Sequence, residues 1–223
     1  YTSGGQSKFK DSFHRVLDHK TVYIPPPPFR FVLLNNNLQT IEKTPFFLEV
    51  KTMGDVVPDQ VEIVFENQSY LLKKLNDNQF QYKFINPTKS IPFRLSSNNV
   101  QSETFNLEVL LPPKIIASSL NVSYPAYTKK TNQNISHLTD ISVPEGTQLT
   151  WSLTTQDTER VIFSQDDSKF DFSQDGNQFY ANKQVFSDLN YSIETNNNKL
   201  KSYETLFFNV RVIQDQPPSI DVL

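Results

Sequence analysis

The chain has 223 residues, a net charge of −3, 18 phenylalanines, 14 prolines and no cysteine. The lack of cysteine excludes a disulfide framework, a thiolate metal site and a cysteine nucleophile. Because the net charge is small and the lysines and arginines are scattered along the sequence, we expect no nucleic-acid partner.

The first predicted element is a short amphipathic helix within residues 7–19. Phe9, Phe13, Val16 and Leu17 are spaced as i, i+4, i+7 and i+8 and form one apolar stripe. We expect this stripe to dock on the domain that follows; a membrane-surface or partner-binding helix is the alternative. Four prolines at 25–28 exclude both a continuing helix and a central strand, and they favour a stiff polyproline II spacer.

After the prolines the hydrophobic period changes to two. Phe80, Tyr82 and Phe84, for example, alternate with Gln81 and Lys83, the pattern of a half-buried antiparallel strand. Similar patterns predict strands at 29–34, 46–51, 61–65, 70–73, 80–84, 93–95 and 105–109. Seven short strands separated by turns are typical of an immunoglobulin-like sandwich.

The second half of the chain repeats the first. Residues 76–80 (NDNQF) align with 175–179 (DGNQF), and residues 103–109 (ETFNLEV) align with 204–210 (ETLFFNV). Both halves end on a proline pair, at 112–113 and 217–218. A repeat of roughly 100 residues is too long for a solenoid unit and suits a whole β-sandwich.

The second half therefore predicts a second sandwich, and the fold class is all-β. We expect two tandem immunoglobulin-like β-sandwiches preceded by a short amphipathic helix. The predicted strands of the second sandwich are 115–122, 147–153, 160–163, 169–172, 178–181, 189–194 and 204–213. The predicted organisation is an N-terminal helix and linker (1–24), a first sandwich (25–111), a second sandwich (112–216) and the start of a following segment (217–223).

Three aromatic residues are candidates for an interaction site. Tyr124 and Tyr127 lie in a connection, residues 124–140, that is longer than its counterpart in the first half. Tyrosines on a long loop suit recognition, but they also suit packing of the loop on its own sheet. Phe207 has the outward phase of its strand. Trp151 shares the inward phase with Leu149 and Leu153, so we expect it in the core rather than on a sugar-binding platform.

No motif predicts catalysis. Residues 171–177 (DFSQDGN) resemble the first half of a calcium loop, but Asn182 stands where the bidentate glutamate should be, and a hairpin turn explains the sequence better. The three histidines have no metal-ligand spacing, and no nucleophile elbow or phosphate-binding glycine loop is present. We therefore expect no enzyme activity, no metal and no cofactor.

Several phrases together resemble a known family. They are residues 112–115 (PPKI), 122–128 (VSYPAYT), 141–151 (ISVPEGTQLTW) and 215–220 (DQPPSI). The most specific is the Pro-Glu-Gly-Thr step into the tryptophan-bearing strand. The chain resembles the extracytoplasmic immunoglobulin-like region of a Bacteroidetes-type, membrane-anchored protein family of unknown function. The resemblance implies periplasmic exposure and transfers no catalytic residue.

On these grounds we expect a non-catalytic periplasmic spacer and protein-interaction module of an inner-membrane-anchored envelope protein, with a role in envelope assembly or secretion. Its partners would be proteins of the cell envelope. No apolar run reaches the ~18 residues of a membrane span, so we expect membrane contact only through segments absent from this chain. Two alternatives stay open: a carbohydrate- or peptidoglycan-binding module using the region of Tyr124 and Tyr127, and an accessory domain of an enzyme located elsewhere in the full chain.

Overall fold

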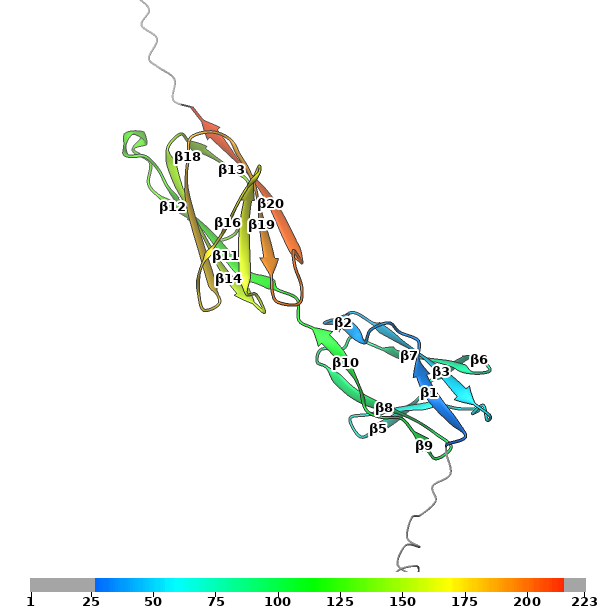
Figure 1. Cartoon of the computed structure of the whole chain (residues 1–223). Helices are drawn as coiled ribbons and strands as arrows, with labels where there is room; N and C mark the ends of the chain where they lie inside the picture. The colour runs from blue at the N-terminus through cyan, green and yellow to red at the C-terminus, as the bar shows by residue number, and fades with distance from the viewer. Residues whose placement is uncertain (1–26, 215–223) are drawn as a thin grey trace, which may run out of the picture. The chain divides into compact units, whose positions relative to one another are not determined.

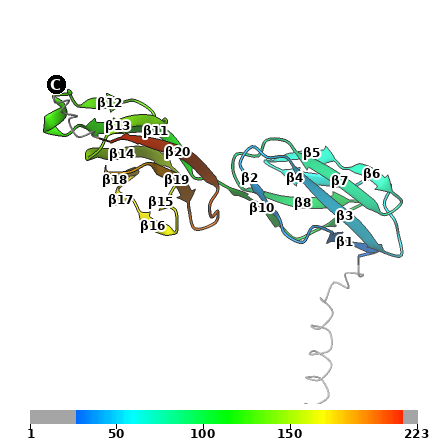
Figure 2. The ribbon, with the colours of Figure 1, turned by 90° about the horizontal axis from the view of Figure 1, so that it is seen from above.

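A computed structural model describes residues 27–214. The helix expected within residues 1–24 and the segment 217–223 lie outside the described residues, so both stay predictions. The described residues form strands and one short 3-10 turn. In each half of the chain the strands form two facing sheets, coloured blue to green in the first half and green to red in the second (Figure 1, Figure 2).

The first sandwich is made of ten strands. One sheet has the order β1-β3-β7-β6, and the other has the order β2-β10-β8-β4-β5 with β9 beside β8. The strands are β1 (Phe29–Leu33), β2 (Gln39–Ile41), β3 (Phe46–Gly54), β4 (Glu62–Phe65), β5 (Gln68–Leu71), β6 (Lys73–Asn76), β7 (Gln79–Phe84), β8 (Ile91–Ser97), β9 (Val100–Gln101) and β10 (Phe105–Leu110).

The second sandwich repeats this plan. Its sheets have the orders β12-β11-β14-β18-β17 and β13-β20-β19-β15-β16. The elements are β11 (Lys114–Ser123), the 3-10 turn η1 (Ala126–Thr128), β12 (Gln133–Ile135), β13 (Ile141–Pro144), β14 (Thr147–Gln156), β15 (Arg160–Gln165), β16 (Ser168–Asp171), β17 (Ser173–Asp175), β18 (Gln178–Val185), β19 (Leu189–Asn196) and β20 (Glu204–Ile213).

Both halves have the strand order of an immunoglobulin-like sandwich. In immunoglobulin lettering, the order A-B-E-D corresponds to β1-β3-β7-β6 in the first half and to β11-β14-β18-β17 in the second. Strands C, F and G are neighbours in the facing sheet, as β4, β8 and β10 in the first half and as β15, β19 and β20 in the second. The prediction of two tandem immunoglobulin-like sandwiches is thereby confirmed. Strand β10 ends at Leu110 and β11 begins at Lys114. The exact domain bounds given above stay a prediction.

The sequence pattern missed three short strands in each half: β2, β6 and β9 in the first, and β12, β13 and β17 in the second. Strand β2 pairs in parallel with β10, and β13 pairs in parallel with β20. Each of the missed strands has only two to four residues. A segment that short carries too few alternations to be recognised, and the partners of β2 and β13 lie far along the chain.

Alternating side chains from both sheets fill each interior, as the period of two predicts. In the first sandwich the fully buried side chains are mainly phenylalanine, leucine and isoleucine: Phe29, Leu48, Ile63, Phe80, Phe93, Leu95 and Leu107. In the second, the largest buried side chain is Trp151, which is 0% exposed. The expectation that Trp151 belongs to the core is confirmed.

Trp151 links the two sheets of the second sandwich. Its indole Nε1–H on β14 donates a hydrogen bond of 2.9 Å to the hydroxyl oxygen of Tyr191 on β19. The Trp151 ring also makes edge contacts with Phe163 and Tyr191, whose rings stack on each other with centroids 4.9 Å apart. Because Tyr191 is buried, its pKa is raised to about 12.

Candidate interaction surfaces of the second sandwich

The long connection of the second sandwich is an ordered structure rather than an open loop. Its first part forms η1, which projects from the end of the sandwich in Figure 1, and its second part forms β12. Strand β12 pairs antiparallel with β11, through Leu120 with Ile135 and Val122 with Gln133. This extra strand covers the edge of β11. It has no counterpart among the described strands of the first sandwich.

Tyr124 holds the start of this connection against the sandwich. Its ring packs on the hydrophobic core, and the Lys130 ammonium lies 5.4 Å from the centre of the ring. The Tyr124 backbone N–H donates to Asn132 Oδ1 at 3.1 Å. Tyr124 therefore stabilises the connection through its ring and its backbone.

Tyr127 lies on η1 and combines an exposed ring with an anchored hydroxyl. Its side chain is 57% exposed, while its hydroxyl donates a 2.9 Å hydrogen bond to the carbonyl oxygen of Glu145. Glu145 belongs to the turn between β13 and β14, and its own N–H donates to the carbonyl of Ile213. Tyr127 thus presents an aromatic face to solvent from a fixed position.

Two Tyr127 variants separate the anchor from the aromatic face. We expect Tyr127→Phe to lower the free energy of unfolding by about 1 kcal/mol, because one partly exposed hydrogen bond is lost. If the ring contacts a partner, Tyr127→Ala loses crosslinked partner in cells while Tyr127→Phe keeps it. Urea unfolding and crosslinking of both variants provide the measurements. Full partner recovery with Tyr127→Ala would show that the residue is only structural.

Phe207 lies on the outer face of the other sheet. It is 77% exposed, more than any other large hydrophobic side chain in residues 27–214. The strand register places it beside Ser192 on β19, which in turn lies beside Ser164 on β15. These two small side chains leave a hollow of about 240 Å³ next to the Phe207 ring.

Polar groups surround this hollow, and one of them is unsatisfied. Within the described residues, Ser164 Oγ is buried and makes no hydrogen bond. Asn209, which also lines the hollow, is held by both oxygens of Asp140: its N–H donates at 2.8 Å and its Nδ2 at 3.2 Å. These hydrogen bonds lower the pKa of Asp140. We call Phe207, Ser192, Ser164, Asn190 and Asn209 the Phe207 surface.

The three predicted aromatic residues do not form one site. Tyr127 is fixed at the turn that pairs with Ile213, at one end of β20. Phe207 lies six positions back along the same strand, about 20 Å away at the usual rise per residue of a strand. The long connection reaches the Phe207 surface at Asp140, its last residue, which accepts hydrogen bonds from Asn209.

The residues that resemble a calcium loop form a hairpin. Asp175 ends β17, Gly176 has a φ of +60°, and β18 begins at Gln178. The Asp171 carboxylate accepts two hydrogen bonds from Arg160, at 2.7 and 3.1 Å. Across residues 27–214, no three acidic, histidine or cysteine side chains gather at a point that could hold a metal ion. In the same range, no helix has both the length and the hydropathy needed to cross a membrane.

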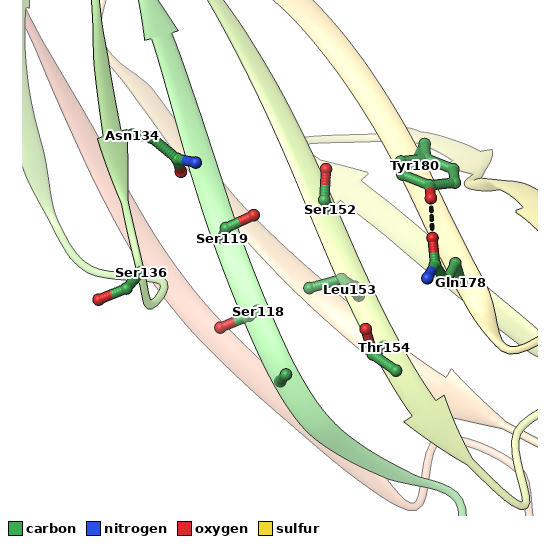
Figure 3. A pocket seen from close by; sticks show the side chains of 10 residues that line it. Ser118, Ser119, Asn134, Ser136, Ser152, Leu153, Thr154, Gln178 and Tyr180 are labelled. Atoms are coloured by element: carbon green, nitrogen blue, oxygen red, sulfur yellow. Dashed lines mark hydrogen bonds between the residues drawn. The ribbon is translucent and has the colours of Figure 1, made fainter.

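One further surface was not predicted from the sequence. The outer face of the sheet β12-β11-β14-β18-β17 contains a hollow of about 370 Å³. Figure 3 shows Asn134 and Ser136 on one side of it, Tyr180 and Gln178 on the other, and serines between them. Isolated serines and asparagines carry no sequence signal, so only the strand register could reveal that they share one face.

Comparison with known proteins identifies structural neighbours only. No family model and no curated protein matches the chain. Among solved structures, the chain is similar to fibronectin type III-like modules of Clostridium thermocellum CbhA (8% identity, TM-score 0.37, covering 86% of this chain and 100% of that one). It is also similar to an I-band fragment of titin (13%, 0.48, 85% and 67%) and to bovine butyrophilin (10%, 0.45, 84% and 100%). At such identities and scores these matches carry no information on activity or partners.

Proposed function

We propose that this chain is a non-catalytic spacer and protein-interaction module in the periplasmic part of an inner-membrane-anchored envelope protein, with a role in envelope assembly or secretion. Two sandwiches built on one plan, each with its own buried core, suit a spacer. The periplasmic location rests on the family resemblance of the sequence. The interaction role rests on the Phe207 surface.

The observation that carries the interaction role is the exposure of Phe207 on the outer face of its sheet, beside a hollow. Aromatic side chains, phenylalanine included, are enriched at protein interfaces relative to the rest of the surface. The Phe207 ring contributes little to the stability of the fold, because most of its surface stays in water.

Phe207→Ala tests this role. We expect the free energy of unfolding to stay within about 0.5 kcal/mol of the parent value, as for most exposed positions. A photocrosslinking amino acid at Asn209, on the same surface, should form a discrete protein adduct in cells, and Phe207→Ala should remove it. Phe186→Ala is the matched control. Phe186 is an exposed phenylalanine as well, at 57%, but it follows the end of β18 and lies outside the Phe207 surface. An adduct that survives Phe207→Ala, or that Phe186→Ala removes equally, would contradict the proposal.

The location is tested on the full-length protein in its own cells. Protease added to spheroplasts should cut within this region while a cytoplasmic marker protein stays intact. Intact cells, whose outer membrane excludes the protease, serve as the control. Resistance of the region in spheroplasts, with cutting only after the inner membrane is disrupted, would place it in the cytoplasm and contradict the periplasmic role.

A further inference from the structure

The hollow on the outer face of the sheet β12-β11-β14-β18-β17 is lined by polar and apolar side chains and by no charged residue. Charged side chains border it on the same face: Asp175 lies opposite Gln178, and Lys114 lies opposite Gln156. The side chains of this face alternate with those of the core, as the burial of β14 and β18 shows. We call the uncharged part of this face the neutral face. It consists of Ala117, Ser119 and Asn121 on β11, Asn134 on β12, Thr150, Ser152 and Thr154 on β14, and Gln178, Tyr180 and Asn182 on β18. This set contains no aspartate, glutamate, lysine, arginine or histidine.

The neutral face is hollowed rather than flat. The register aligns Ser119, Ser152 and Tyr180 in one row across three strands. The two serines are small and form the floor of the 370 Å³ hollow, while Tyr180 forms one wall and Asn134 of β12 the other (Figure 3). The Tyr180 hydroxyl donates to Gln178 Oε1, which fixes the ring beside the hollow. The inserted strand β12 therefore builds one side of a groove.

The first sandwich offers a direct comparison, because the register identifies equivalent positions. Phe80 lies opposite Val50 in the first sandwich, and Phe179, its counterpart in the repeat, lies opposite Leu153 in the second. Counting from these pairs, Glu49 corresponds to Ser152 and Lys51 to Thr154.

The equivalent face of the first sandwich is charged. It carries Glu49, Lys51 and Lys83 where the second has Ser152, Thr154 and Asn182. Glu49 accepts a 3.4 Å hydrogen bond from Gln81, which corresponds to Tyr180. The same fold thus accepts charged side chains at these positions. A stable sandwich does not require the neutral residues of the second copy.

We propose that the neutral face binds an uncharged oligosaccharide. Hydroxyl and amide groups both donate and accept hydrogen bonds, which matches the mixed donors and acceptors of sugar hydroxyls. The exposed face of Tyr180 can cover the apolar face of a sugar ring. An anionic ligand would lose hydration here without meeting a positive charge in the lining of the hollow. A protein partner fits less well, since serine and alanine are depleted at protein interfaces.

This binding site is independent of the Phe207 surface, which lies on the opposite sheet of the same sandwich. The two surfaces also take different ligands, a carbohydrate on the neutral face and a protein on the Phe207 surface. Loss of one activity therefore leaves the other intact, and the two proposals fail separately.

Native electrophoresis in gels that contain a polysaccharide tests the proposal. The probes are dextran, yeast mannan, soluble starch and hydroxyethyl cellulose, with alginate as a charged polymer. We expect at least one neutral polymer to slow the protein and alginate to leave its migration unchanged. For Tyr180→Ala, the polymer concentration that gives the same retardation should rise at least tenfold. Ser152→Glu, which copies the Glu49 position of the first sandwich, should abolish it.

Two controls keep the outcome clear. Glu49→Gln on the equivalent face of the first sandwich should retain full retardation, as should Phe207→Ala. Thermal melting of each variant shows that it is folded, and Thr154→Lys replaces Ser152→Glu if the latter melts early. No retardation by any neutral polymer, retardation by alginate alone, or equal retardation of Tyr180→Ala would each overturn the proposal.

Discussion

Trp151→Ala lowers the free energy of unfolding of the second sandwich by about 3–5 kcal/mol, the range for removing a buried large aromatic side chain. The indole is completely buried between two sheets and contacts Phe163 and Tyr191. The variant also leaves the Tyr191 hydroxyl without its donor. Urea unfolding followed by circular dichroism gives the measurement.

Fluorescence provides an independent check, because Trp151 is the single tryptophan of the chain. We expect a blue-shifted emission maximum in the folded protein that moves to the red on unfolding. Leu48→Ala, at the equivalent position of the first sandwich, is the matched control and should leave the tryptophan emission of the folded protein unchanged. A native emission maximum typical of water-exposed tryptophan would contradict the core position.

Raising the pH from 10 to 12 destabilises the second sandwich through Tyr191. Burial raises the pKa of Tyr191 to about 12, whereas an unfolded tyrosine titrates near 10. Between these values the unfolded chain has lost the proton that the folded protein still holds, so stability falls as the pH rises. The stabilisation is complete below pH 10 and amounts to about 2–3 kcal/mol, most of which is lost by pH 12.

Tyr191→Phe isolates this effect from the other titrating groups. At pH 8 the variant should be less stable than the parent by about 1–3 kcal/mol, because the buried Trp151 N–H loses its acceptor. Since the variant cannot ionise at this position, the difference should shrink by about 2 kcal/mol at pH 11.5. Urea unfolding at both pH values measures it. A difference that does not change with pH would show that Tyr191 titrates normally.

The Trp151–Tyr191 pair explains how a sandwich without cysteine ties its sheets together. In antibody domains a disulfide joins strands B and F across the core. Strands β14 and β19 are the B and F strands here, and the Trp151–Tyr191 hydrogen bond joins the same two strands. The first sandwich has Leu48 and Phe93 at the matching positions, both fully buried. One copy therefore has a hydrogen-bonded pair at these positions, and the other has two buried apolar side chains.

The sequence by itself determined the features that depend on neighbouring residues. The alternation around Phe80 and around Trp151 predicted the main strands and their inward faces, because the side chains of a strand point to opposite sides at every step. The internal repeat predicted two sandwiches of one plan. The same phase argument placed Phe207 outward, and the structure confirms its exposure.

Only the tertiary structure decided which distant residues meet. The parallel strands β2 and β13, the strand β12 that covers β11, and the Trp151–Tyr191 bond between residues 40 positions apart all depend on pairing across the chain. The neutral face and the hollow beside Phe207 depend on register as well. A shift of one residue would send every side chain of a strand to the other face. Serines and asparagines leave no periodic signal of their own, so the surfaces they form exist only once the sheets have assembled.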